Sequence, residues 1–217
     1  MNTLLKVSEL GVNGARRGEW QVEDIYLEVH AGEKVAVIGE TGVGKTVMAE
    51  MIVGLRKPHH GSIESFGDIA WVPQNFNLYR DLTVQENLEF VSTINGFDRS
   101  QIAELIQKTG FNGWEGCKVK KLSIGQQKML LLAAALCQNY SILVMDEPTA
   151  GLSTAQRKTM MGIFDDITAV GQGILIFTDV DEDAALCDKV LKLQKDCRDE
   201  ASAYHGVWYA CLNEVGK

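Results

Sequence analysis

The chain contains the stretch GETGVGKT, which begins at Gly39 and is a complete G-x-x-x-x-G-K-T pattern. A loop that wraps phosphate groups must turn its backbone N–H groups inward with little side-chain obstruction, and Gly39, Gly42 and Gly44 permit that approach. Lys45 supplies a compact cation for the β- and γ-phosphate oxygens, and the Thr46 hydroxyl is the expected protein ligand of a Mg²⁺ ion that bridges them. The pattern therefore predicts a phosphate loop that binds a nucleoside triphosphate.

The residues on both sides of this loop fit a strand-loop-helix unit. Residues 34–38 form a short apolar run that is typical of a buried parallel strand. Apolar side chains then follow the helical spacing at Met48, Met51, Ile52 and Leu55. We therefore expect a helix to begin at the loop and to direct the positive end of its dipole at the phosphates. The residues expected to bind the nucleotide here are Gly39, Glu40, Thr41, Gly42, Val43, Gly44, Lys45, Thr46 and Val47.

The charge balance of the 217 residues is acidic, because 21 Lys and Arg residues stand against 29 Asp and Glu residues, which gives a net charge of −8. The sequence has no dense cluster of Lys or Arg, so its composition does not support nucleic acid as a partner. Its length and apolar content fit one α/β core with at most a small inserted subdomain. We therefore expect a single domain that spans residues 1–217.

The cysteines and the apolar runs bear on the compartment of the chain. Five cysteines are widely spaced, with an odd total and no C-x-x-C pair, which argues against a disulfide framework or a zinc site and favours reduced cytoplasmic thiols. The most apolar run, residues 129–137, is too short to cross a bilayer, and the N-terminus lacks a secretion signal pattern. The sequence predicts a soluble chain whose membrane role, if it has one, comes from a partner.

A second candidate site follows another apolar run, residues 142–145, which ends in Asp146, Glu147 and Pro148. Ligands of open parallel sheets bind at the carboxyl ends of the strands, so we expect Asp146 beside the phosphate loop, where it would hold Mg²⁺ through water. Glu147 would accept a proton from an attacking water, which is the general-base role in phosphoanhydride hydrolysis. Taken alone, such a pair of acids is more often a solvated strand end; the phosphate loop favours metal binding and catalysis.

The order of the predicted elements indicates the fold class. A third buried strand, residues 173–178, follows a helix-like stretch at residues 154–170. Short strands that alternate with helices indicate a parallel sheet with helical crossovers, and therefore the α/β class. Residues 4–10 and 21–30 instead have the character of antiparallel strands. We expect a mixed, mostly parallel sheet flanked by helices, with a small antiparallel β flank.

Between the two candidate sites the sequence reads LSIGQQ, from Leu122 to Gln127. With this stretch the chain resembles the ATPase subunits of ABC transporters, whose signature reads LSGGQ. Ser123 and Gln126 also form an S-x-x-Q capping box that opens an apolar helix, and the N-terminus of such a helix suits an anion. The resemblance implies a P-loop NTPase of the ABC ATPase type that binds ATP and Mg²⁺. It also implies a head-to-tail dimer, in which Ser123, Gly125 and Gln126 cover the γ-phosphate held by the opposite subunit.

Gln74, in the stretch WVPQ, matches the Q-loop glutamine of this family, which senses Mg²⁺ and the attacking water. Residues 76–122 would then form the inserted helical subdomain, which in the family contacts a membrane partner. The residues themselves fit helices, because Thr83 and Glu86 form another capping box. One helical face would gather Ile102, Leu105 and Ile106. The resemblance implies a metal site of Thr46, Gln74 and Asp146 and a catalytic group of Gln74, Glu147 and Asp179.

Four positions depart from the family pattern. Asp179 stands where the family has a switch histidine; a histidine can donate a hydrogen bond to the γ-phosphate and the attacking water, whereas an ionised aspartate only accepts and repels phosphate oxygens. Ile124 replaces a signature glycine, Val47 replaces a second hydroxyl, and Ser153 replaces the usual aspartate of the D-loop. We therefore expect hydrolysis to be slow or impaired in this half-site, although the retained Glu147 argues against a fully inactive one.

The leading hypothesis is the ATP-binding subunit of an ABC transporter, which couples ATP binding and slow hydrolysis at the dimer interface to a separate transmembrane permease subunit. Residues 78–88 are most similar to the exporter branch, which handles drugs, lipids or polysaccharides, so we expect an exporter. Such a subunit would be cytoplasmic and peripheral on the inner face of the cell membrane. Its partners would be the permease and another ABC ATPase domain, in a homodimer or a heterodimer, with no nucleic acid and no stable small-molecule ligand other than the nucleotide.

Two other functions are open at this point. One is a soluble ABC-type ATPase in protein assembly, repair or translation, although the short spacing between Lys45 and Ser123 excludes the long coiled-coil chromosome type. The other is a regulatory module that uses ATP mainly to dimerise, which Asp179 favours and Glu147 opposes. The resemblance extends from about residue 4 to residue 195, and the tail, residues 196–217, matches nothing in the family.

Overall fold

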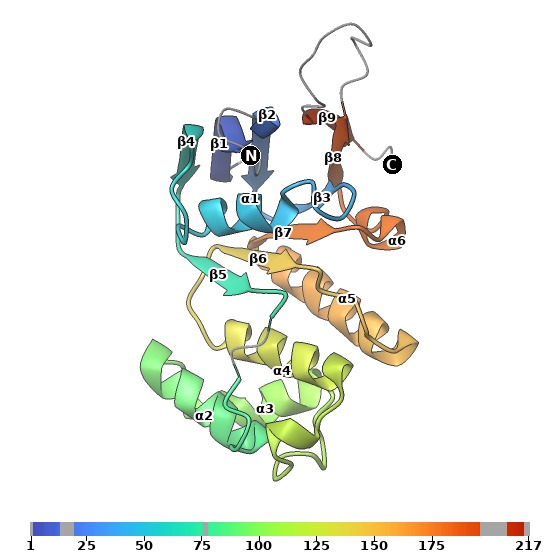
Figure 1. Cartoon of the computed structure of the whole chain (residues 1–217). Helices are drawn as coiled ribbons and strands as arrows, with labels where there is room; N and C mark the ends of the chain where they lie inside the picture. Colours follow the sequence, from blue (N-terminus) through green and yellow to red (C-terminus); the bar gives the residue numbers. More distant parts are fainter. Residues whose placement is uncertain (1, 14–19, 76–77, 196–207, 215–217) are drawn as a thin grey trace, which may run out of the picture.

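The computed structural model describes residues 2–13, 20–75, 78–195 and 208–214. Within them one sheet has the strand order β4-β1-β2-β9-β8-β3-β7-β6-β5 (Figure 1). The strands are β1 (Thr3–Asn13), β2 (Trp20–His30), β3 (Lys34–Ile38), β4 (His60–Ser65), β5 (Ile69–Val72), β6 (Ile142–Asp146), β7 (Gly173–Thr178), β8 (Lys189–Lys195) and β9 (Trp208–Glu214). The α-helices are α1 (Lys45–Ile52), α2 (Val84–Asn95), α3 (Ile102–Lys108), α4 (Ile124–Leu136), α5 (Thr154–Ala169) and α6 (Asp181–Ala184), with 3₁₀ turns at Arg99–Gln101 and Val119–Lys121.

The sheet has a parallel part and an antiparallel part. Strands β5, β6, β7, β3 and β8 run parallel to their neighbours in this series. β1 pairs antiparallel with both β2 and β4, which confirms the predicted antiparallel flank. β9 joins the two parts, because it pairs parallel with β2 and antiparallel with β8. This joining strand lies in the C-terminal stretch, residues 196–217, for which the sequence predicts no element.

The alternation of side chains along the parallel strands separates the core into two layers. In β6, Ile142 and Val144 pack into the layer that contains α1 and the β flank, whereas Leu143 and Met145 pack into the layer of α4 and α5. Because both faces of these strands are covered, every residue of β6 and β7 is buried, and the strands read as continuous apolar runs. The three buried strands predicted from the sequence are therefore confirmed.

Helix α1 ends one turn sooner than the helical spacing predicted. It stops at Ile52, and Gly54 follows with a φ of 79°, in the left-handed region that favours glycine. Leu55 lies beyond this turn and is 66% exposed. The expectation that Leu55 continues the buried face of the helix is therefore wrong.

Helices α2 and α3 pack with α4 at the end of the molecule opposite the β flank (Figure 1). The Thr83 hydroxyl accepts a hydrogen bond from the Glu86 N–H at 3.2 Å, and the Glu86 carboxylate accepts one from the Thr83 N–H at 2.7 Å, so the predicted capping box is confirmed. Ile102, Leu105 and Ile106 are buried on α3, as expected. This helical layer occupies the stretch between β5 and β6 that the sequence predicts to be inserted; the first two residues of the predicted subdomain lie outside the described ones.

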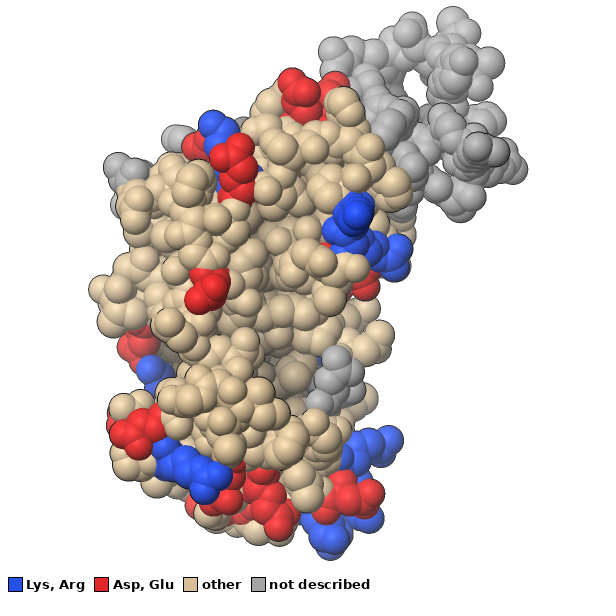
Figure 2. All heavy atoms as spheres, turned by 90° about the vertical axis from the view of Figure 1, so that its left-hand side faces the viewer, with Lys and Arg blue, Asp and Glu red and all other residues tan. Residues whose placement is uncertain are grey.

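Charges of both signs are mixed on the face that Figure 2 shows. Over the helical end of this face, Lys and Arg lie among Asp and Glu. Among the residues that the structure describes, no helix combines the length and the apolar character needed to cross a bilayer.

Candidate functional site

The loop between β3 and α1 has a backbone that only glycine adopts easily. Gly42 and Gly44 have φ values of 87° and 108°, and Gly44 is the residue from which α1 begins. Gly39 is required for a different reason, because a Cβ atom at this position would lie 2.9 Å from Val43 Cγ1. The Val43 side chain is itself buried in the core, so it anchors the loop to the layer beneath. The predicted strand-loop-helix unit is confirmed.

Lys45 is buried at the start of α1 and extends back along the loop. Its Nζ donates to the carbonyl oxygens of Gly39 at 2.6 Å and Glu40 at 3.3 Å. The same Nζ lies 3.8 Å from Glu147 Oε1. The phosphate loop and the residue after β6 are therefore close together, although β7 lies between β3 and β6 in the sheet.

Thr46 and Asp146 meet although they are 100 residues apart in the sequence. The Thr46 hydroxyl donates to Asp146 Oδ2 at 2.7 Å. Asp146 is buried, and burial raises the pKa of its carboxyl group. Its second oxygen, Oδ1, is buried and has no hydrogen-bond partner in the described part of the chain. A buried acceptor without a donor, next to a hydroxyl, fits a hard cation such as Mg²⁺, and these two residues could hold one.

Glu147 has an uncommon backbone conformation, with a φ of 49°. Its N–H donates to the carbonyl of Phe177 on β7 at 2.8 Å, and its own carbonyl accepts a hydrogen bond from Lys128 Nζ. Burial, reinforced by the charge and a hydrogen bond of Asp179, raises the pKa of the Glu147 carboxyl group to about 7. A carboxylate with this pKa is suited to accept a proton near neutral pH.

Asp179 follows the last residue of β7 and lies over the phosphate loop. Its Oδ2 accepts a hydrogen bond from the Thr41 hydroxyl at 3.5 Å. Asp179, which we expected at the position of a switch histidine, thus lies at the cleft, where it faces Glu147 and contributes a second carboxylate.

These groups line one open cleft with a volume of about 330 Å³. Its lining contains Thr41, Gly42, Gly44, Lys45, Thr46, Val47, Gln74, Glu147, Ala150 and Asp179. The cleft therefore brings together the phosphate loop and all three residues expected to be catalytic, Gln74, Glu147 and Asp179. Ala150 was not among the predicted residues; it reaches the cleft because it lies in the turn after Glu147.

The signature residues do not line this cleft. The Ser123 hydroxyl accepts from the Gln126 N–H at 3.2 Å, and the Gln126 side chain accepts from the Ser123 N–H at 2.9 Å, so the predicted capping box is confirmed. A Cβ on Gly125 would lie 2.8 Å from the carbonyl oxygen of Gly151, so this glycine allows α4 to pack against the loop before α5. Ile124, beside it, is 62% exposed.

Ser153, which we expected in the D-loop, caps a helix. The Ser153 hydroxyl accepts from the Gln156 N–H at 3.3 Å, and the Gln156 side chain accepts from the Ser153 N–H at 3.0 Å. Ser153 is therefore the N-cap of α5, in a capping box like those of α2 and α4.

Two buried charged residues near the site were not predicted from the sequence. Asp183, in α6, is 1% exposed and accepts hydrogen bonds from Thr149 and Arg157, which join the loop after β6 to α5 and α6. Lys128, in α4, is 7% exposed and contacts the backbone of Glu147. The available signal for Lys128 was that it is the one charged residue in the sequence of α4 and directly precedes an apolar run.

A family model described as ABC transporter matches residues 22–150. The chain is similar to the aliphatic sulfonates import ATP-binding protein SsuB 2 of Pseudomonas syringae pv. tomato, with 33% identity over 180 residues that cover 80% of this chain and 76% of that protein. It is also similar to the Nod factor export ATP-binding protein I of Burkholderia orbicola, with 32% identity over 203 residues that cover 86% of this chain and 67% of that protein.

Solved structures have the same fold. The structure of an ATP-binding subunit of an ABC transporter has a TM-score of 0.78 and 25% identity, covering 88% of this chain and 85% of that one. A dimeric ATP-binding cassette in a post-hydrolysis state, bound to ADP and Pi, has a TM-score of 0.82 and 19% identity, covering 99% of this chain and 100% of that one. The second likeness concerns the fold alone, because its sequence identity is low.

Proposed function

Because the chain belongs to the ABC transporter family, we propose that it is the ATP-binding subunit of a transporter, in which ATP binding and slow hydrolysis at a head-to-tail dimer interface are coupled to a separate transmembrane subunit. The observation that supports this most strongly is the meeting of Lys45, Thr46 and Asp146 at the carboxyl ends of β3 and β6. A chain that only dimerised would not need a base beside them, yet Glu147 is present with a pKa of about 7.

The proposed reaction uses few groups of this chain. The loop N–H groups and Lys45 hold the phosphates, and Glu147 accepts a proton as water forms a bond to the γ-phosphorus and the bond to the leaving ADP oxygen breaks. Thr46 and Asp146, with Gln74 beside them, would hold Mg²⁺, which when bound neutralises charge on the phosphate oxygens. Because Glu147 must be ionised to act as a base, turnover should rise as the pH rises through about 7.

Slow hydrolysis is part of the proposal because of Asp179. An ionised aspartate at this place cannot donate a hydrogen bond to the γ-phosphate, and it repels both the phosphate oxygens and an ionised Glu147. Loss of one donor that stabilises a transition state typically costs a few kcal/mol, which is roughly a hundredfold in rate. Asp179 and Ile124 together favour an asymmetric dimer, in which another ABC ATPase domain supplies an intact signature helix and its own histidine.

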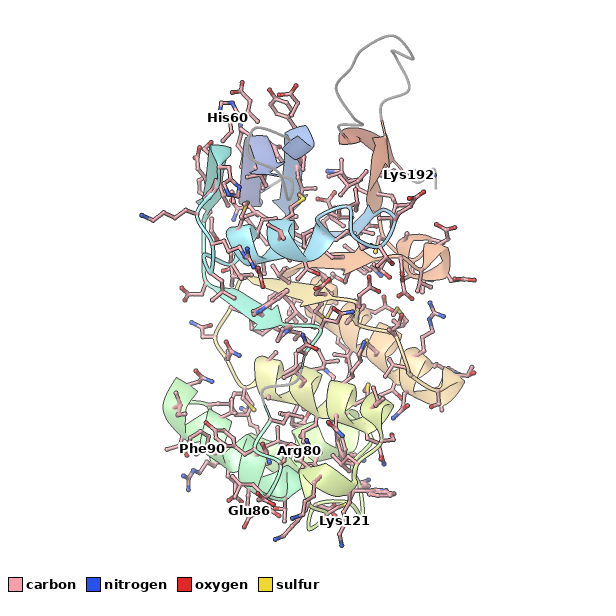
Figure 3. All side chains as sticks on the ribbon, viewed as in Figure 1. His60, Arg80, Glu86, Phe90, Lys121 and Lys192 are labelled. Carbon is pink, nitrogen blue, oxygen red and sulfur yellow. The ribbon has the colours of Figure 1, made fainter. Side chains whose placement is uncertain are left out.

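The transmembrane partner is proposed to contact the helical segment at residues 76–122, which we treat as an inserted subdomain. Tyr79 and Phe90 make an edge-on ring contact with centroids 4.7 Å apart and are 49% and 41% exposed, and Ile94 on the same helix α2 is 67% exposed. Phe90 projects from α2 at the helical end of the molecule, on which Arg80 and Glu86 also lie (Figure 3). Exposed apolar groups rimmed by charges suit a protein contact.

The direction of transport and the location follow from the same proposal. Residues 78–88 are most similar to the exporter branch, so we propose export; the named relatives include one import protein and one export protein. The chain would then be cytoplasmic and held at the inner face of the cell membrane by its permease. A second candidate, a regulatory or soluble ABC-type ATPase that uses ATP mainly to dimerise, is favoured by one observation, the carboxylate of Asp179 opposite Glu147.

Isolation of the tagged chain from detergent-solubilised membranes of its own cells tests the transport role. We expect recovery with a protein that has several membrane spans, and loss of that protein in Phe90→Asp without loss of MgATP binding. Val170→Asp is the matched control, because Val170 is 76% exposed and is the C-cap of α5, outside the helical segment at residues 76–122. Recovery of all three proteins without any integral membrane protein would overturn the transport role and favour the second candidate.

A further inference from the structure

Helix α4 buries one charge in an otherwise apolar interior. Lys128 is the single charged residue in the sequence of α4 and is 7% exposed. Burial lowers the pKa of its ammonium group, and the charges of Glu147, Asp146 and Asp183 oppose that effect. Removing a charge from water is costly unless the charge is paired, so the groups that surround Lys128 indicate its role.

The hydrogen bond of Lys128 goes to the backbone and not to a carboxylate. Its Nζ donates to the carbonyl oxygen of Glu147. On the other side of the same residue, the Glu147 N–H donates to the Phe177 carbonyl at 2.8 Å. The left-handed backbone of Glu147, with its φ of 49°, is therefore held from β7 at one end and from α4 at the other. A non-glycine residue keeps such a conformation only where its surroundings impose it.

This backbone conformation decides where the Glu147 side chain points. With it, the carboxylate reaches the cleft and lies 3.8 Å from Lys45 Nζ. Lys128 itself does not line the cleft. Any effect of Lys128 on a reaction in the cleft must therefore act through another residue, and Glu147 is the one whose backbone accepts its hydrogen bond.

We propose that Lys128 is a positioning residue, which holds Glu147 in its left-handed conformation and ties the direction of its carboxylate to the signature helix α4. The inference rests on the proposed function, because the direction of the Glu147 carboxylate affects turnover only if Glu147 acts as a base. Ser123 and Gln126, which form the capping box of the same helix, lie within the five residues before Lys128. A movement of α4 at a subunit interface would thus reach the base of its own subunit through one hydrogen bond.

Amide hydrogen exchange in the full chain tests the contact itself. Lys128→Met keeps an unbranched side chain, one atom shorter, and removes the donor. In this variant we expect the Glu147 amide to exchange at least about tenfold faster, with the Val144 amide in the middle of β6 unchanged. Lys121→Met, a substitution of an exposed lysine just before α4, is the matched control and should leave both amides unchanged. If Lys128→Met does not fold, Lys128→Gln shortens the donor and serves in its place. An unchanged Glu147 amide in the variant that folds overturns the proposal.

Kinetics then separate a positioning role from a general structural one. We expect Lys128→Met to lower turnover about tenfold or more with the Kd for MgATP within threefold, and Lys128→Arg to restore part of the rate. Equal losses of MgATP binding and turnover would contradict the proposal. Failure of the unmodified chain to bind MgATP would contradict the proposed function. The amide measurement does not depend on catalysis, so it would still test whether Lys128 holds the backbone of Glu147.

Discussion

The two walls of the cleft carry opposite kinds of polar group. The wall formed by the phosphate loop and α1 presents backbone N–H groups, the Lys45 ammonium and the Thr46 hydroxyl. The wall at the ends of β6 and β7 presents two carboxylates, Glu147 and Asp179. Burial, reinforced by the facing Asp179, raises the pKa of Glu147 to about 7. The first wall suits an anion throughout, whereas the second repels one. Binding a nucleotide and hydrolysing it therefore depend on different groups. A sequence can keep nucleotide binding while hydrolysis becomes slower.

The largest effect should come from removing the cation of the first wall. Lys45→Ala deletes a charge-assisted contact worth about 1.5–3 kcal/mol, so we expect the Kd for MgATP to rise by up to about 100-fold. Isothermal titration calorimetry measures it, with Lys192→Ala as the control, because Lys192 is exposed on β8. Equal affinities in the two variants would mean that the loop does not hold the phosphates as described.

The second wall can be changed by restoring the donor that it lacks. Asp179→His should raise ATP turnover about tenfold or more in the assembled complex, because a donor replaces a carboxylate that repels phosphate. Asp179→Ala is the matched variant, which removes the charge without adding a donor and should give a smaller gain. If Asp179→His turns over ATP no faster than the unmodified chain, Asp179 is not the cause of slow hydrolysis.

The raised pKa of Glu147 also predicts how stability depends on pH. Its folded-state pKa of about 7 lies above the ordinary value of 4.5, so between these values the folded chain keeps a proton that the unfolded chain releases. The contribution of Glu147 to stability therefore falls as the pH rises through this window. Glu147→Gln removes that titration. The free energy of unfolding of Glu147→Gln, relative to that of the unmodified chain, should therefore increase by about 2 kcal/mol between pH 4.5 and pH 7.5.

Urea denaturation at a series of pH values measures this difference. Glu64→Gln, which changes an exposed carboxylate on β4, is the control substitution. A difference between Glu147→Gln and the unmodified chain that stays constant with pH would show that the second wall does not hold Glu147 in a destabilising environment.

The smallest effect concerns the signature helix α4, whose residues belong to neither wall of the cleft. Ser123→Ala removes the cap of α4 and should cost about 1 kcal/mol of unfolding free energy, and Thr83→Ala should cost a similar amount at α2. Only Ser123→Ala should weaken ATP-dependent dimerisation, measured by sedimentation. If both variants dimerise alike, the α4 N-terminus does not contact the nucleotide of a second subunit.

Three central strands of the parallel part, β3, β6 and β7, could be predicted because each is a buried apolar run bounded by turn residues. Residues 34–38, 142–145 and 173–178 have that form, and all three runs lie in strands. β4 could not be predicted in this way, since its residues are mostly exposed and it exists through pairing with β1. β8 and β9 likewise depend on pairing between segments whose side chains give no clear pattern.

The site was predictable where neighbouring residues form a motif and not where the fold brings single residues together. The phosphate loop and the acids after β6 were found because their spacing has a chemical reason. Lys128 was missed because a lysine in a helix is usually solvated, and only the packing of α4 under the β6 loop buries it. Leu55 was wrongly assigned because the periodicity continued past a glycine that ends the helix.

The claim that binding and hydrolysis are separable in this chain is tested most directly by measuring both on the same purified samples. ATP turnover is followed over a range of protein concentrations, with bound MgATP quantified in each sample and Glu147→Gln as the inactive control. The account predicts saturable binding of MgATP together with slow turnover that rises faster than linearly with protein concentration and disappears in the control. Fast turnover that is proportional to protein concentration, or no binding of MgATP at all, would contradict it.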